Sequence, residues 1–227
     1  MSKRARKPNM HRVRLRNEAL YLSPLRGLFW PARKTVFVAD VHLGKGATFR
    51  SQGVPVPSGS MTSDLARLSR LVHRTAAERL IILGDLFHAA AGMDEATISS
   101  AQAWRDRHPE LDVALIRGNH DRRVGAVPST LRVDECEPPV SEGPFTLAHD
   151  PDVHSSNFVL AGHLHPGIRL HEAKWSERLP CFHLTSGCAV LPAFSEFTGL
   201  SEVSPNLGDQ VFVVADGQVI PVHQGSR

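Results

Sequence analysis

TVFVADVH, residues 35–42, sets a pattern that the chain repeats: a short apolar, β-branched run followed at once by side chains that can ligate a metal. LIIL at 80–83 leads into Asp85, and VALI at 113–116 leads into Asn119. Between these runs, residues 60–78 carry apolar side chains at helical spacing, and residues 94–108 open with the acidic residues typical of a helix start. Strands alternating with helices predict a parallel sheet.

The second half of the chain holds more strand-like runs than helical ones. FTLA at 145–148, FVLA at 158–161 and VFVVA at 211–215 are bounded by turn formers, and Asp216-Gly217 predicts a hairpin. VFVVA is the longest apolar run, whereas a membrane-spanning helix needs about 20 residues. We expect a basic, flexible tail over residues 1–17, one domain over 18–227, and no membrane association.

Five of the strand-like runs end in residues that ligate metals. The carboxyl ends of strands in such sheets line a common crevice, so these side chains are expected to converge. Residues two apart in an extended segment project to the same side, which suits the Asp-x-His and His-x-His motifs. Three of the residues follow a glycine, which lets the backbone approach a bound group closely. The set is Asp40, His42, Asp85, Asn119, His149, His163 and His165.

This donor set holds nitrogen and oxygen atoms and no thiolate. It therefore favours Mn²⁺, Fe or Zn²⁺ over a structural zinc built from cysteines. Seven ligands are too many for one tetrahedral ion, and one carboxylate can bridge two ions. The prediction is a binuclear centre of two divalent ions, with manganese preferred, of the kind used for in-line attack at phosphorus.

The ordered motifs DVH, GDLFH, GNHD, a single His and GHLH resemble those of the calcineurin-like metallophosphoesterases. Over roughly residues 18–222, the segments LGKGATFRSQGVPVPSGS, RGNHDR, LAHDP, GHLHPG, RLPCF and LPAFSEFTG resemble the bacterial ligase-associated DNA damage response endonucleases. One departure is Asp150-Pro151 after His149, where many superfamily members carry Gly-His; another is Leu200 after FTG, where a second Gly is usual. The resemblance implies a mixed α/β fold, a two-sheet β-sandwich flanked by helices in four α/β/β/α layers.

Site roles also follow from the resemblance. His120 is implied to stand beside the scissile phosphate as the general acid, and Asp121 to orient its ring through the ring N–H. Two ion sites that share Asp85 are implied, one formed by Asp40, His42 and His165 and the other by Asn119, His149 and His163.

Basic residues near the motifs are candidate contacts to the substrate. Residues 44–60, rich in Gly, Pro and Ser, follow the first motif directly and predict a loop over the site. His88 is a candidate for orienting a ligand or the substrate, with a capped surface histidine as the alternative. For each basic residue, an ordinary solvated position is the alternative. The candidate phosphate contacts are Lys45, Arg50, Arg117, Arg122 and Arg123.

The N-terminus is strongly basic, although the net charge of the chain is only +3. This asymmetry indicates a polyanionic partner, and a solvated tail that aids solubility is the equal alternative. No apolar stretch follows the basic residues, and the cysteines at 136, 181 and 188 lack CxxC spacing. Both features favour a cytoplasmic protein. The basic residues of the N-terminus are Lys3, Arg4, Arg6, Lys7, Arg12, Arg14 and Arg16.

These features predict a metal-dependent phosphodiesterase or endonuclease that acts on DNA. The resemblance adds an expected role in DNA repair, beside an ATP-dependent DNA ligase and an associated helicase or exonuclease. One alternative is a phosphoesterase for a small nucleotide or cyclic nucleotide, against which the absence of an obvious capping domain argues. Another is a nucleic-acid-binding module with little catalysis, against which the complete set of motifs argues.

Overall fold

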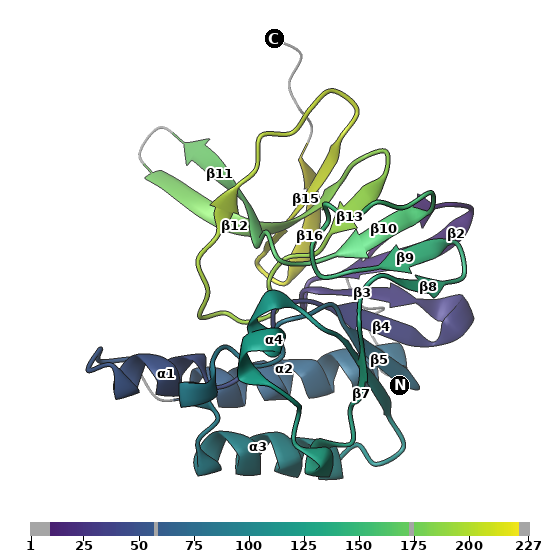
Figure 1. Ribbon diagram of the computed structural model, residues 1–227. Coiled ribbons are helices and arrows are strands. Elements are labelled where there is room, and N and C mark those ends of the chain that lie inside the picture. Colours follow the sequence, from purple (N-terminus) through teal and green to yellow (C-terminus); the bar gives the residue numbers. More distant parts are fainter. Residues whose placement is uncertain (1–9, 57–58, 173–174, 223–227) are drawn as a thin grey trace, which may run out of the picture.

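The computed structural model describes residues 10–56, 59–172 and 175–222, and its frame is two β-sheets packed face to face (Figure 1). The first sheet runs in chain order. Its first four strands pair antiparallel, and its last four pair parallel, as the alternation of strands and helices predicted. The strands are β1 (His11–Leu15), β2 (Glu18–Ser23), β3 (Gly27–Trp30), β4 (Thr35–Val38), β5 (Arg79–Ile82), β6 (Asp112–Ile116) and β7 (Asp134–Cys136).

Helices connect the parallel strands and cover the outer face of this sheet. In α2 (Ser60–Thr75), Leu65, Leu68 and Leu71 are buried at helical spacing. In α3 (Glu95–Asp106), the side chain of Asp94 caps the first turn by accepting from the Thr97 N–H at 2.8 Å. The remaining helices are α1 (Lys45–Ser51), α4 (Asn119–Val124) and the short 3₁₀ turns η1 (Pro31–Arg33), η2 (Ala90–Gly92) and η3 (Ser129–Leu131).

The second sheet comes almost wholly from the second half of the chain. Its strands β9 and β10 pair in parallel, and β12 pairs antiparallel with β15. Strands β15 and β16 form the predicted hairpin across residues 216–217. The strands are β8 (Val140–Glu142), β9 (Phe145–Leu147), β10 (Phe158–Ala161), β11 (Pro166–Glu172), β12 (Trp175–Leu184), β13 (Cys188–Val190), β14 (Ser201–Glu202), β15 (Gln210–Ala215) and β16 (Gln218–Val222).

Strand periodicity divides the core into two layers. Along β4, Phe37 faces the second sheet, while Val36 and Val38 face α2 and α3. Because both faces of the parallel strands are covered, they read as continuous apolar runs. The mixed α/β class and the two packed sheets flanked by helices are therefore confirmed. In the described ranges, the helices α1 to α4 all precede residue 125, and Figure 1 shows α2 and α3 beneath the first sheet.

The N-terminal boundary differs from the predicted one. Residues 11–15 form β1, whose Val13 is buried while Arg12 and Arg14 are exposed. The His11 ring packs on Phe212 of the second sheet, with centroids 4.8 Å apart. The predicted tail over 1–17 was wrong for residues 11–15, which form a strand. In the sequence, alternating arginines on an edge strand cannot be told from a charged, solvated segment. Residues 1–9 lie outside the described residues.

The segment after the first motif was also mispredicted in part. Residues 45–51 of the expected loop form α1. Gly44 opens this helix with φ 74°, and its backbone lies so close to that of Gly92 in η2 that a Cβ at Gly44 would be 2.1 Å from the Gly92 carbonyl oxygen. A helix fixed by this long-range contact leaves little trace in local composition. None of the described helices has the length and apolar character needed to cross a membrane.

Candidate metal centre

The predicted ligands lie at the carboxyl ends of strands, where the two sheets meet. Asp40 follows β4, Asp85 follows β5 and Asn119 follows β6, while His149 follows β9 and the GHLH histidines follow β10. A left-handed backbone is uncommon for residues other than glycine, costs about 1–3 kcal/mol, and gathers at functional sites. Five of the ligands adopt it: Asp40 (φ 55°), His42 (50°), Asp85 (55°), His163 (68°) and His165 (46°).

Backbone hydrogen bonds hold these strained loops together. The Asp40 N–H donates to the Gly84 carbonyl (3.1 Å), and the His42 N–H donates to the Asp85 carbonyl (2.9 Å). The carboxylate of Asp40 accepts from the His163 N–H at 3.0 Å, so the ends of β4 and β10 are joined directly. The ligand loops of both sheets therefore form one connected unit.

Asp121 contributes to this unit in a way that differs from the prediction. Its buried carboxylate accepts from three backbone N–H groups, those of Asp85 (2.7 Å), Leu86 (3.0 Å) and Gly118 (2.8 Å). The ring Nδ1 of His120 is instead paired with the backbone carbonyl of His88. The prediction that Asp121 orients the His120 ring was wrong, because the carboxylate is used to pin the loops after β5 and β6.

Two glycines are required by the close packing of the ligands. A Cβ at Gly84 would lie 2.1 Å from Nδ1 of His149, and a Cβ at Gly118 would lie 2.3 Å from Oδ1 of Asp85. Such distances are far below van der Waals contact, so any other residue would displace a ligand. This agrees with the close approach predicted for glycines that precede the ligands.

The first ligand group forms around Asp40. Nε2 of His42 lies 3.3 Å from Nε2 of His165, and that atom lies 3.3 Å from Oδ1 of Asp40. These three ligand atoms are mutually within 4.8 Å. Oδ1 of Asp40 is buried and has no hydrogen-bond partner among the described residues. A bound cation would satisfy such a buried carboxylate oxygen.

The second ligand group forms around His149. Its Nε2 lies 3.0 Å from Oδ1 of Asn119, 3.0 Å from Nδ1 of His163 and 3.4 Å from Oδ2 of Asp85. Its Nδ1 lies 3.0 Å from the Leu83 carbonyl, which can only accept, so Nδ1 carries the hydrogen and Nε2 is turned to the other ligands. Asp40, Asp85 and His149 also form a group within 4.8 Å, which joins the two sets through the carboxylates of Asp40 and Asp85.

Burial and charge set the protonation of these groups. Burial lowers the pKa of His42 to about 2, so its ring is neutral and free to ligate. Burial alone would raise the pKa of Asp85, but hydrogen bonding and charge from His149 bring it below its usual value. Burial would lower the pKa of His149, yet the Asp85 carboxylate overcomes this and raises it to about 9. His149 thus holds a proton where an ion would bind.

The residues present fit divalent metal ions. The neutral His42, the unpartnered Asp40 oxygen and the neighbouring Asp85 carboxylate provide a mixed nitrogen and oxygen set without thiolates. Such sets suit Mn²⁺, Fe and Zn²⁺. A metal would release the proton that His149 holds, because a ligand nitrogen must be deprotonated.

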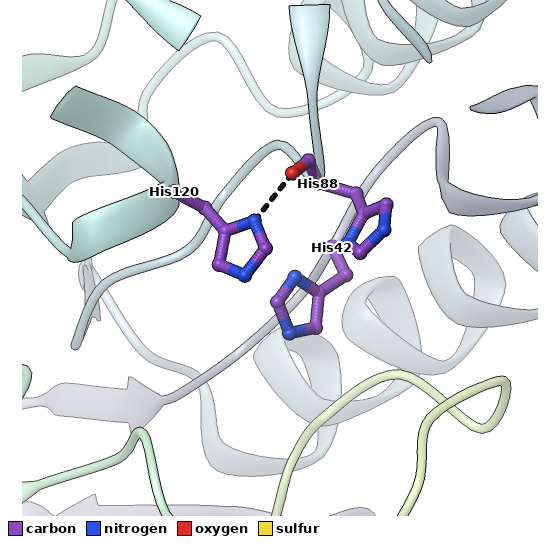
Figure 2. A group of neighbouring side chains, drawn as sticks. All are labelled: His42, His88 and His120. Carbon is purple, nitrogen blue, oxygen red and sulfur yellow. Dashed lines mark hydrogen bonds between the residues drawn. The ribbon is translucent and has the colours of Figure 1, made fainter. Parts of the chain in front are cut away.

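A third group consists of histidines alone and includes the ligand His42. Figure 2 shows the rings of His42, His88 and His120 turned toward one another. His120 stacks on His88 with centroids 5.0 Å apart and planes at 25°. Because Nδ1 of His120 is held by the His88 carbonyl, its Nε2 is the free nitrogen, 3.9 Å from Oδ2 of Asp85. The His120 side chain is 27% exposed, so a substrate can reach it. His88, three residues after Asp85, therefore lies beside His120.

The candidate phosphate contacts differ in their surroundings. Nζ of Lys45 donates to the Thr198 hydroxyl at 2.7 Å. Burial lowers the pKa of Lys45, and the charges of Asp40 and Asp85 oppose this. Arg50 is exposed in the last turn of α1. Arg123 is exposed on α4.

Arg117 and Arg122 share a surface pocket with Asn119, His149 and His163. Their charges, however, are already paired: the Arg117 guanidinium lies 3.3 Å from Glu137, and that of Arg122 lies 3.2 Å from the same carboxylate. Local sequence gave no sign of this partner, because it approaches from the segment after β7.

Comparison with known proteins agrees with this geometry. The family model described as calcineurin-like phosphoesterase matches residues 33–183, so the chain belongs to that family and is a hydrolase of phosphoesters. Among solved structures, the Pseudomonas putida nuclease MPE is similar: it is 40% identical, with a TM-score of 0.83, over 94% of this chain and 100% of that chain. Yfce, a phosphoesterase from E. coli, aligns over 83% of this chain and 97% of that one at 15% identity and a TM-score of 0.39, which adds nothing to the assignment. A search of curated proteins found no match.

Proposed function

We propose that this protein is a phosphodiesterase with two divalent metal ions that hydrolyses the phosphodiester bonds of DNA. The observation that carries the proposal is the pair of adjoining groups of ligand atoms, Asp40–His42–His165 and Asp40–Asp85–His149, with the free Nε2 of His120 standing 3.9 Å from the Asp85 carboxylate. A binuclear site with a proton donor at its open side suits in-line displacement at phosphorus.

The proposed ions are held by Asp40, His42 and His165 on one side and by Asn119, His149 and His163 on the other. When bound, such ions polarise the phosphoryl group and lower the pKa of a bound water. We favour manganese, with iron or zinc as alternatives, because the donor set mixes imidazole, carboxylate and amide groups.

His120 is proposed to give a proton to the leaving oxygen. The His88 carbonyl accepts from Nδ1 and fixes the ring, so the transferable proton is the one that Nε2 carries in the imidazolium form, and the ring is neutral after giving it. The deoxyribose alkoxide is a poor leaving group and needs this proton, whereas a nitrophenolate leaves readily without it. The need for His120 should therefore depend on the leaving group.

DNA is favoured as the substrate for two reasons. The similar Pseudomonas putida protein is described as a nuclease, and it covers almost the whole of this chain. The N-terminal segment is rich in arginine and lysine, and Arg12 and Arg14 are exposed on β1. A role in DNA repair beside an ATP-dependent DNA ligase and its associated helicase or exonuclease, in the cytoplasm, is proposed from the sequence resemblance alone.

The test uses full-length protein stripped of metal and refilled with Mn²⁺. Hydrolysis is measured for bis(4-nitrophenyl) phosphate, 4-nitrophenyl phosphate, a cyclic nucleotide and a DNA strand, with the Asp85→Asn variant as the inactive control. We expect turnover of the diester and of DNA that requires metal and disappears in the variant. Metal-loaded protein that cleaves neither would overturn the proposal and favour a binding module. Cleavage of a cyclic nucleotide but not of DNA would favour the small-molecule alternative.

A further inference from the structure

The motif LPAFSEFTG, residues 191–199, supplies none of the proposed metal ligands, yet it runs along the metal centre. The Phe194 N–H donates to the Ala39 carbonyl (2.7 Å), and the Ser195 N–H donates to the carbonyl of Asp40 (3.2 Å). Its first residue is tied to β10, because the Leu191 N–H donates to the Ala161 carbonyl at 2.8 Å. The segment, here called the strap, therefore lies directly beside the first ligand.

Two buried or half-buried arginines fix the strap to the rest of the fold. The Arg67 guanidinium forms ion pairs with Asp64 and Glu196 and donates to the Phe194 carbonyl. It also lies over the Phe194 ring, 4.5 Å from the centroid. Arg26 donates to the carbonyls of residues 193 and 195, at 3.3 Å and 2.9 Å. With both its side chains and its carbonyls held, the strap is a rigid support.

The far end of the strap meets α1 at two points. The Thr198 hydroxyl accepts from Nζ of Lys45 at 2.7 Å. The Phe197 ring meets the Phe49 ring edge to face, with centroids 5.6 Å apart. Phe49 in turn stacks on His88, with centroids 6.0 Å apart and planes at 20°. The strap thus supports both Lys45 and, through Phe49, His88.

The Lys45 ammonium has three N–H groups, and Thr198 takes one of them. Lys45 is the first residue of α1, three residues after the ligand His42, and its backbone N–H donates to the His42 carbonyl at 3.2 Å. Its charge also interacts with Asp40 and Asp85, so the lysine stands beside the first ligand loop. A lysine side chain is long and flexible, and it loses much of its rotamer freedom when it is held at one point. An anchor on a rigid strap would keep it in place beside that loop.

We propose that Thr198 is a positioning residue, which holds the Lys45 ammonium so that its remaining N–H groups bind a non-bridging oxygen of the substrate phosphate. This inference rests on the proposed phosphodiesterase function. It gives LPAFSEFTG a role in the reaction, and it makes Lys45 the best placed of the candidate phosphate contacts.

The test compares Thr198→Val, which keeps the shape but cannot accept a hydrogen bond, with Thr198→Ser, which restores the hydroxyl. Both are made in the full chain and in a Lys45→Met background. The measurements on Mn²⁺-loaded protein are kcat and KM for bis(4-nitrophenyl) phosphate and, independently of turnover, the Kd of inorganic phosphate by calorimetry. Metal content and thermal unfolding are followed to confirm that each variant folds.

We expect Thr198→Val to raise both KM and the phosphate Kd by about three- to tenfold, the worth of one such hydrogen bond, and Thr198→Ser to stay close to wild type. In the Lys45→Met background, Thr198→Val should add no further loss. Wild-type values for Thr198→Val, or an equal loss in the two backgrounds, would overturn the inference while leaving the phosphodiesterase proposal intact. Phosphate binding that depends on Thr198 in a protein without diester turnover would instead overturn the phosphodiesterase proposal.

Discussion

Two walls of the site differ in how they are built. The ligand wall, made of the proposed metal ligands, is the more buried at its base: the side chains of Asp40, Asp85 and His149 are only 0%, 3% and 4% exposed, while Asn119, His163 and His165 are half-buried. The substrate wall, made of Lys45, His88, His120 and the nearby arginines, comes from helices and loop ends, and His120 is 27% exposed. A buried, strained wall suits ions that remain bound between turnovers. A more accessible wall suits a substrate that has to enter and leave the site.

The ligand wall should be the more sensitive to substitution. Asp85→Asn removes the carboxylate that is proposed to bind both ions, so we expect the content of bound Mn²⁺ to fall and diester turnover to drop by roughly a thousandfold. Elemental analysis and initial rates measure these effects. Asp150→Asn is the matched control, because Asp150 is exposed in the pocket beside the ligands. Full metal content in Asp85→Asn would contradict its place between the ions.

The substrate wall should affect chemistry without affecting metal binding. We expect His120→Gln to lower DNA cleavage by about 10²- to 10⁴-fold, to lower nitrophenyl diester hydrolysis much less, and to leave the Mn²⁺ content unchanged. The comparison of the two substrates isolates proton donation to the leaving oxygen. His154→Gln, at an exposed histidine outside the motifs, is the control. Equal losses with both substrates would argue against the general acid.

The two ion sites should differ in their response to pH. In the protein without metal, the pKa of His149 is raised to about 9 by Asp85 against the effect of burial, whereas burial lowers that of His42 to about 2. Between pH 7 and 9, an ion at the His149 site must displace a proton, so its affinity should rise about tenfold per pH unit and level off above pH 9. His42 imposes no such cost on the other site.

Calorimetry in buffers of different ionisation enthalpy counts the protons released. About one proton per chain is expected at pH 8, released with the ion bound by His149. Binding of both ions without proton release would show that His149 is neutral before metal arrives.

The smallest effect should come from β1, far in sequence from both walls. Arg12→Gln combined with Arg14→Gln is expected to weaken DNA binding by a few-fold at low salt and to reduce the slope of log Kd against log salt by about 2. Hydrolysis of the nitrophenyl diester should not change. The matched control replaces the exposed Arg74 and Arg107 on the helical side. An unchanged slope of log Kd against log salt would show that these arginines do not contact DNA, and would favour a role of the basic N-terminus in solubility.

The ligand wall was predictable because strand periodicity and the position of strand ends fix it. Once TVFVA and LIIL are recognised as neighbouring strands, the rule that their carboxyl ends meet places Asp40 and Asp85 together. His163 joins them from the second sheet, because FVLA ends at the same edge. The pairing of the strands then fixes which side chains converge at the site.

The substrate wall was harder to predict because distant residues decide it. The hydrogen bond between Lys45 and Thr198 joins residues 153 positions apart. Glu137 pairs with Arg117 and Arg122 from the segment after β7. Asp121 was predicted to orient the His120 ring, but its carboxylate accepts hydrogen bonds from three backbone N–H groups. Long-range partners of this kind leave no local signal in the sequence.

The most direct test of the binuclear centre is an anomalous-difference map of Mn²⁺-soaked crystals, collected at the manganese edge. We predict two peaks, one among Asp40, His42 and His165 and the other among Asn119, His149 and His163, with Asp85 touching both. A single peak, or a peak held by His42, His88 and His120 in place of one of these, would contradict the division of the site into a ligand wall and a substrate wall.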